Sequence, residues 1–407
     1  MLTTEKGVPG DPGGRIPELD GLRGLAILLV IVCHYIGGAE HAPLGFWMHH
    51  ALTVLSIGWS GVDLFFVLSG FLIGGILMDA REAPNYFRTF YLRRVHRILP
   101  VYYLWILLYG VLVGGAMWLL PGRFGVGSQD LLQIPLYLLF LQNLHYSLTP
   151  FQWTWFNVTW SLAVEEQFYL LAPPLIRFLS IRRITWVLAA TIGLAPLLRL
   201  LVFRSLAPPL GSYAAVLTMP CRADALAFGI FLAMAWRKEE FRAFLDGHRL
   251  LLQRVLLALL LGVAGLLWWL VRPTNGVMIS VGYTWLAAFY SCLVLLVLAQ
   301  KQGWVGGVMR WGVLRGLGVI SYCVYIVHET LNLLAHQLLL HGRPEVYDFK
   351  GVGVTLLSLV LTLVVASLSW RYFEKPLIRR GHGYSYWGEA PHAERRLESS
   401  EVQALKV

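Results

Sequence analysis

Long apolar runs separated by short polar segments follow one another along almost the whole chain. They lie near residues 21–38, 57–78, 98–120, 131–146, 158–179, 184–203, 213–235, 250–271, 278–299, 313–340 and 351–373. Most of them match the roughly 20 apolar residues that a helix needs to cross a bilayer. The pattern therefore predicts an all-α polytopic membrane protein.

The basic residues predict which runs cross the membrane, because lysine and arginine favour the cytoplasmic side. If the run 131–146 crossed, Arg177, Arg182 and Arg183 would lie outside, against this rule. Treating it as non-spanning places these and the later basic loops inside. We therefore expect about ten transmembrane helices, both termini cytoplasmic, and a non-spanning or re-entrant segment near 131–157.

Composition supports a chain buried in lipid. Hydrophobic residues make up 57% of the sequence and charged residues 14%, against about 25% charged in soluble domains. The net charge of +10 is spread over short loops, which argues against nucleic acid as a partner and favours a cell membrane. Polar tails, 1–18 and 381–407, flank one membrane domain, 19–380. The four cysteines stand singly in apolar runs, which predicts neither disulfides nor a thiolate metal site.

Two ionisable residues in the first run are candidates for function, since such groups are costly inside a membrane. Arg23 and His34 are eleven residues apart and fall on nearly the same helix face. The helical rise places His34 about 16 Å beyond Arg23. A neutral imidazole can accept a proton near neutral pH, so His34 is a candidate general base. The alternative is a histidine packed in the core.

Further polar residues are expected in the outer half of other spans. Ser161, Glu165 and Tyr169 follow one another at a spacing of four and share a helix face, whereas Glu166 points about 100° away. Glu165 is therefore the better candidate for an interior role. The others are Asp63, Arg222, Asp224 and His328, of which Arg222 and Asp224 are expected to form an ion pair. Together these groups predict a water-accessible pocket, although each alone fits a buried packing pair.

A basic cluster precedes the third span. Arg93, Arg94 and Arg97 are three and four residues apart, so a helix would present them together. Guanidinium groups suit phosphates because of their fixed fork geometry. The alternatives are a plain topology signal or contact with lipid headgroups. The chain contains neither a P-loop nor a His-Glu-x-x-His motif, which argues against nucleotide hydrolysis of the P-loop kind and zincin chemistry.

Seven segments in order resemble the acyltransferase family 3 membrane proteins over about residues 17–380. They are ELDGLRGLAILLVIVCH, GVDLFFVLSGFLIGG, RRVHRILPVYY, TWSLAVEEQFYLLAP, RADALAFGIFLA, ISYCVYIVHET and RYFEKPLIRR. The resemblance implies about ten spans and transfer of acetyl or other short acyl groups from cytoplasmic acyl-coenzyme A. The acceptors it implies are hydroxyls of glycans, lipids, peptidoglycan or macrolide-type products. It also matches Arg23 and His34 to the family's essential pair, and Arg93–Arg97 to its donor-binding motif.

The resulting hypothesis assigns a role to each group. Acyl-coenzyme A, the co-substrate, would bind Arg23, Arg93, Arg94 and Arg97. His34 would act as the general base, oriented by Glu165. No metal or bound cofactor is expected. The acceptor would enter among Asp63, Ser161, Arg222, Asp224 and His328. The sequence leaves open whether a transient acyl-imidazole intermediate forms on His34. Many relatives carry an appended hydrolase-like domain, and we expect no step here that needs one. The alternatives are a transporter or flippase and, less favoured, a receptor or assembly factor.

Overall fold

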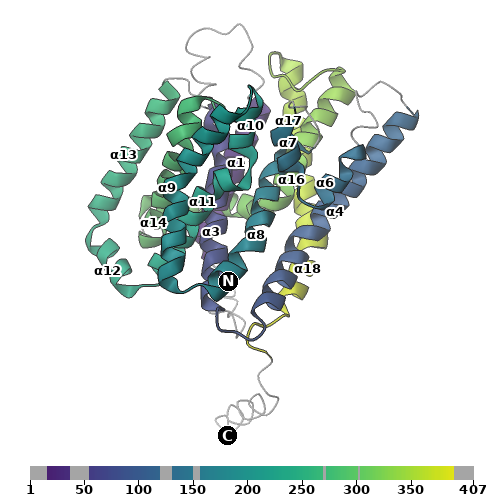
Figure 1. The fold of residues 1–407 in the computed structure, drawn as a ribbon. Coiled ribbons are helices and arrows are strands. Elements are labelled where there is room, and N and C mark those ends of the chain that lie inside the picture. The colour runs from purple at the N-terminus through teal and green to yellow at the C-terminus, as the bar shows by residue number, and fades with distance from the viewer. Residues whose placement is uncertain are drawn as a thin grey trace.

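The fold is a bundle of long helices. The computed structural model describes residues 16–36, 55–119, 131–149, 156–268, 272–300 and 303–388, and every regular element in these ranges is helical. The ten longest are α1 (Pro17–Ile36), α3 (Gly61–Asp79), α4 (Tyr86–Leu119), α8 (Trp160–Phe178), α9 (Ile181–Ser205), α11 (Met219–Trp236), α13 (Arg249–Trp268), α14 (Tyr283–Ala299), α16 (Gly312–Leu340) and α17 (Phe349–Ser369). In Figure 1, α1, α3 and α11 lie in the middle of the bundle, with α13 and α4 toward opposite margins. The predicted all-α class is confirmed.

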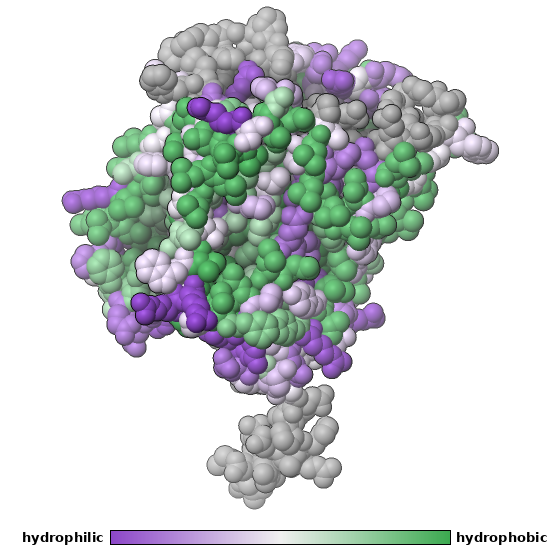
Figure 2. All heavy atoms as spheres, viewed as in Figure 1, coloured by the Kyte–Doolittle hydropathy of each residue, from purple (hydrophilic) through white to green (hydrophobic). Residues whose placement is uncertain are grey.

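Nine of the described helical segments are long and apolar enough to cross a membrane. The tenth long helix, α8, is not among them, and it carries Glu165, Glu166 and Arg177 within its 19 residues. It packs beside α3 in the bundle, so its charged residues lie among other helices. Figure 2 shows hydrophobic residues over the middle of the visible face and hydrophilic residues along its lower edge. The chain is a multi-pass membrane protein.

Short helices lie between the long ones and after the last of them. They are the 3₁₀ turns Ile57–Ser60 and Asn157–Thr159, α6 (Ile134–Leu138), α7 (Gln142–Leu148), α10 (Leu210–Leu217), α12 (Glu239–Gly247), α15 (Trp304–Met309) and α18 (Lys375–His382), with π-helical turns at Met278–Gly282 and Trp370–Glu374. Neither α6 nor α7 could cross a bilayer, so the described part of 131–157 does not span, as predicted. The run 213–235, which was predicted to be one helix, is divided at Thr218. The extended backbone of this residue separates α10 from α11.

Three helices that the charge pattern predicted to run in the same direction end together. Arg237, the residue after α11, pairs with Asp79 at the end of α3, at 2.6 Å. Arg81, just after α3, donates to the carbonyl oxygen of Leu179, just after α8, at 2.6 Å. Because α3, α8 and α11 share this end, their order agrees with ten crossings. That this end faces the cytoplasm stays a prediction.

Helices α1 and α16 are parallel and pack very closely. A Cβ on Gly24 would collide with the carbonyl of Leu314, and one on Gly318 with the carbonyl of Asp20. Farther along the same pair of helices, His34 meets His328. Glycine permits this approach because it has no side chain between the two backbones. The short distance between the two histidines therefore depends on Gly24 and Gly318, which lie about two to three helical turns away.

We expect Gly318→Ala to destabilise the protein by about 1–3 kcal/mol, because the added methyl group meets backbone that cannot move aside. Gly316→Ala is the matched control, since its methyl group would have no neighbour within 4 Å. The midpoint of thermal unfolding in detergent measures both. Equal midpoints for the two variants would show that the α1–α16 contact does not limit stability.

Candidate active site

An inner cavity of about 100 Å³ lies where α1, α3, α4, α8 and α16 converge. Polar groups of all five helices line it: Arg23, Ser69, Arg94, Arg97, Ser161, Glu165, Tyr169, Ser321, Tyr322 and Tyr325. Apolar residues, including Phe65 and Leu162, complete the wall. As the spacing of four predicted, Ser161, Glu165 and Tyr169 all face this space. The cavity is therefore a polar chamber inside an apolar bundle.

The charges around the inner cavity are unbalanced. Its lining includes three arginines and one glutamate, Glu165. Glu165 accepts hydrogen bonds from the hydroxyls of Ser69, at 2.7 Å, and Tyr169, at 3.3 Å. Arg23 lies 3.9 Å from Asp20, whereas Arg94 and Arg97 have no carboxylate within 4 Å in the described part of the chain. A surplus of guanidinium groups in a poorly hydrated space favours an anionic ligand.

Arg93 is engaged elsewhere. Its Nε and Nη2 atoms donate to the carbonyl oxygen of Tyr384, at 3.1 and 2.8 Å, and its guanidinium lies over the ring of Tyr386. Arg93 lies one helical turn before Arg97, at the level where the segment after α18 reaches α4. The three arginines of the basic cluster are therefore not presented together. Arg93 fixes the C-terminal segment, and Arg94 and Arg97 line the cavity.

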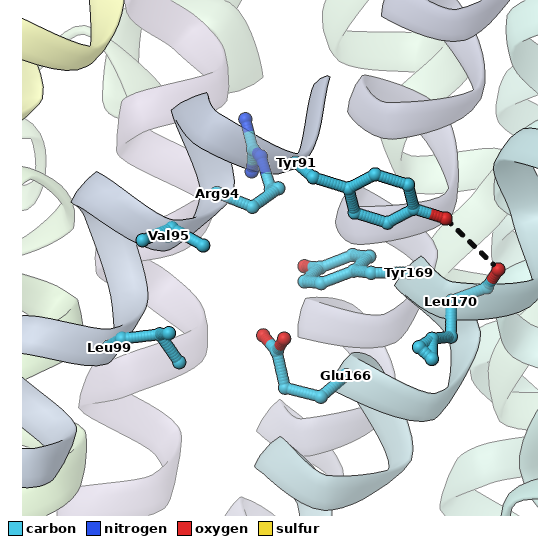
Figure 3. Close-up of a pocket in the computed structure, with 7 residues that line it drawn as sticks. All are labelled: Tyr91, Arg94, Val95, Leu99, Glu166, Tyr169 and Leu170. Atoms are coloured by element: carbon cyan, nitrogen blue, oxygen red, sulfur yellow. Dashed lines mark hydrogen bonds between the residues drawn. The ribbon is translucent and has the colours of Figure 1, made fainter. Parts of the chain in front are cut away.

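A second cavity of about 90 Å³ lies between α4 and α8, and Figure 3 shows the residues that line it. Tyr91 donates to the carbonyl oxygen of Leu170 at 3.3 Å. Pro174, four residues on, has no N–H to bond that carbonyl, which leaves it available to Tyr91. Glu166 and Arg94 both line this cavity. Adjacent glutamates thus face different spaces, Glu165 the inner cavity and Glu166 the second one.

His34 forms a hydrogen-bonded pair with His328. The Nδ1 atom of His34 lies 3.0 Å from the Nε2 atom of His328. The ring of His328 is fully buried, whereas His34 is only partly buried. Glu165, which we expected to orient His34, hydrogen-bonds Ser69 and Tyr169 instead. The residue in contact with the candidate base is a second histidine.

Tyr325 connects the histidine pair with the inner cavity. It lines that cavity, and its ring centroid lies 6.0 Å from that of His328. Its hydroxyl lies 2.5 Å from that of Ser161 and donates to the carbonyl oxygen of Val158 at 2.8 Å. The arginine-lined space and the histidine pair are therefore neighbours along α16, one turn of helix apart at Tyr325.

The expected ion pair between Arg222 and Asp224 is wrong. Arg222 pairs with Asp63 at 2.6 Å, and its guanidinium lies 3.8 Å from the ring centroid of Tyr283. Asp224 pairs with Arg199 at 2.9 Å. Two residues apart on a helix, Arg222 and Asp224 point in different directions, so each meets a neighbouring helix instead.

These two ion pairs are deeply buried. All four charged residues are at most 2% exposed. Arg199 also donates to the carbonyl oxygens of Cys221 and of Ile279, the latter in the π-helical turn Met278–Gly282. A buried pair with as many hydrogen bonds as Arg199–Asp224 typically fixes how helices pack. In the other pair, Oδ2 of Asp63 and Nε and Nη1 of Arg222 have no hydrogen-bond partner among the described residues. Of the five residues expected in an acceptor pocket, only Ser161 lines either described cavity.

Several contributors were missed from the sequence, among them Arg199, Ser69 and Tyr325. Arg199 lies in an apolar run, and a charged residue in such a run is itself a signal of a functional or structural role. Ser69 and Tyr325 lie in segments already singled out, but serine and tyrosine are common in membrane helices and gave no separate signal. None of the four cysteines forms a disulfide.

Comparison with known proteins places these features in a family. A family described as "Acyltransferase domain", the third acyltransferase family, matches residues 16–371. The chain is 29% identical to "Putative peptidoglycan O-acetyltransferase YrhL" of Bacillus subtilis over 90% of this chain and 55% of that protein. It is 24% identical to "O-acetyltransferase OatA" of Staphylococcus aureus over 90% and 58%. The chain thus spans little more than half the length of these relatives. No solved structure matches it.

Removing one member of a buried ion pair should be costly. We expect Asp63→Leu to destabilise the protein by about 3–5 kcal/mol, because the guanidinium of Arg222 cannot lose its charge. The double variant Asp63→Leu with Arg222→Met should regain most of this stability, as measured by thermal unfolding in detergent. If the double variant were stable but had lost acceptor binding, the pair would belong to an acceptor site instead.

Proposed function

We propose that this chain, which belongs to the acyltransferase family 3, transfers an acetyl or other short acyl group from cytoplasmic acyl-coenzyme A to a hydroxyl of an acceptor. The observation that carries the proposal is the inner cavity, where three arginines and one glutamate lie at the base of the helix that bears His34. Such a cavity suits the phosphates of coenzyme A. The acceptor is a glycan, a lipid-linked saccharide or a natural product with a free hydroxyl.

The spacing along α1 supports transfer over part of the bilayer. Arg23 and His34 are separated by eleven residues of one continuous helix, or about 16 Å. With its phosphates held near Arg23, Arg94 and Arg97, the extended arm of coenzyme A would carry the thioester toward His34. The proposed orientation places the arginine end at the cytoplasmic face of the cell membrane, where acyl-coenzyme A is made. The acceptor would then reach His34 from the opposite side.

The chemistry assigned to His34 is general-base catalysis. Its ring would take the proton of the acceptor hydroxyl while the oxygen attacks the thioester carbonyl carbon. Coenzyme A would leave as the thiolate and receive that proton from the imidazolium. His34 suits this task because its ring is only partly buried and so can meet the acceptor. The names of the relatives, all O-acetyltransferases, support a hydroxyl acceptor, and the first names peptidoglycan.

Donor binding is tested by replacing Arg94 and Arg97 together with alanine. The affinity for acetyl-coenzyme A should fall by at least about tenfold, because hydrogen bonds to charged groups contribute about 1.5–3 kcal/mol each. Affinity for acetyl-pantetheine, which lacks the nucleotide phosphates, should change little. Arg93→Ala is the matched control from the same helix and should keep full donor affinity. Equal losses for both donors would assign the arginines to folding or topology.

Catalysis is tested with purified protein in lipid, radiolabelled acetyl-coenzyme A and peptidoglycan fragments or other glycans as acceptors. His34→Gln keeps a hydrogen-bonding group but loses the base, so turnover should fall by about 10²–10⁴-fold. Donor affinity and the unfolding midpoint should stay near those of the unaltered protein. Transfer by His34→Gln within a few-fold of the unaltered rate would show that His34 is structural. Absence of any acetyl transfer or hydrolysis by the unaltered protein would favour a transporter.

A further inference from the structure

The hydrogen bonds of His328 determine which of its nitrogens carries a proton. Its Nδ1 atom lies 2.8 Å from the carbonyl oxygen of Tyr325 and 3.1 Å from that of Val324. A carbonyl oxygen only accepts hydrogen bonds, so Nδ1 must be the donor and carry the hydrogen. In a neutral ring the other nitrogen, Nε2, then has a lone pair and accepts. The tautomer of His328 follows from the backbone of its own helix.

That tautomer determines the state of His34 in turn. The bond between the two rings joins His328 Nε2, an acceptor, to His34 Nδ1 at 3.0 Å. His34 must therefore donate from Nδ1, and its Nε2 atom is left with the lone pair. We propose that His328 is a positioning residue that holds His34 in the Nδ1–H tautomer, so that Nε2 of His34 is the basic nitrogen. This inference rests on the proposed role of His34 as the base.

The surroundings of His328 hold it in one place. Tyr35 of α1 donates to the backbone carbonyl of His328 at 3.2 Å, and the same hydroxyl lies 3.0 Å from that of Thr362 on α17. The ring of Tyr35 also stacks beside that of His328. His328 is 0% exposed, so no water competes for its acceptor nitrogen. Three helices thus fix the group that orients the base.

In a hydrolase triad a carboxylate orients the catalytic histidine, and here the neutral ring of His328 would do the same for His34. When His34 Nε2 takes the acceptor proton, the imidazolium keeps its Nδ1–H bond to His328. The new C–O bond forms as the C–S bond breaks, and His34 Nε2 returns the proton to the thiolate of coenzyme A. A neutral imidazole avoids burying a permanent negative charge in the membrane, where an unpaired carboxylate is costly.

Substitution of His328 separates positioning from packing. In His328→Leu, kcat should fall by about 10–100-fold, as for other residues that orient a functional histidine, while KM for acetyl-coenzyme A stays unchanged. His328→Gln should recover most of kcat, since its amide oxygen can accept from His34 Nδ1–H. The control is His336→Leu: His336 lies on the same helix and is equally buried, but it bonds Thr355. That control should keep the unaltered kcat per folded molecule.

The tautomer itself is measured by ¹⁵N solid-state NMR of histidine-labelled protein in lipid, with His34→Gln identifying the His34 signals among the twelve histidines. We expect an unprotonated Nε2 and a protonated Nδ1 in the unaltered protein, and a mixture of tautomers in His328→Leu or, should that variant not fold, in His328→Phe. A protonated Nε2 in the unaltered protein would overturn the inference, as would a kcat for His328→Leu within about twofold of the unaltered value.

These outcomes distinguish the inference from the function on which it rests. The NMR measurement needs no substrate, so it tests the pairing of the two histidines even if no acetyl transfer is found. Transfer that depends on His34 but not on His328 would leave the proposed function standing and refute the positioning role. Failure of acetyl transfer with the expected tautomer present would refute the function alone.

Discussion

The cost of placing charge inside a membrane governs this structure. Several charged residues between the helices meet an opposite charge: Arg222 with Asp63, Arg199 with Asp224 and, near the start of α1, Arg310 with Glu18. The inner cavity differs, because its lining contains Arg23, Arg94 and Arg97 but a single glutamate. A deficit of negative charge is expensive unless an anion fills it. The same constraint that pairs the other charges therefore supports the proposal that the inner cavity binds an anion.

Close helix packing brings the chemical groups together. Gly24 and Gly318 allow α1 and α16 to touch along their backbones, and the two helices run in the same direction. One helix pair thus carries Arg23 and Tyr322 at the inner cavity and His34 with His328 farther along. Arginine and histidine groups held on one rigid pair of helices keep a fixed separation, which is what the proposed transfer from acyl-coenzyme A requires.

The hydroxyl-rich wall of α8 and α16 lies between these two places. Ser161 and Tyr325 form a hydrogen-bonded pair at one end of the inner cavity, and Tyr325 also neighbours His328. Neutral hydroxyls can exchange partners without moving charge through the bilayer, so they suit the proposed passage of a neutral thioester better than ionised groups would. The chain spans little more than half the length of its curated relatives, yet it contains both the arginine cavity and the histidine pair.

Much of this could be predicted from the sequence, and physical reasons separate that part from the rest. The all-α multi-pass class, the failure of 131–149 to span and the common face of Ser161, Glu165 and Tyr169 follow from hydropathy, charge and helical spacing, which are properties of single segments. The partners of the individual side chains could not be predicted in this way. Arg222 and Asp224 are near in sequence but bond Asp63 and Arg199; Arg93 bonds Tyr384; and His34 meets His328 rather than Glu165. Which side chains meet depends on the rotation and depth of each helix against its neighbours, and these are decided by contacts between distant segments, such as the one between Gly24 and Leu314.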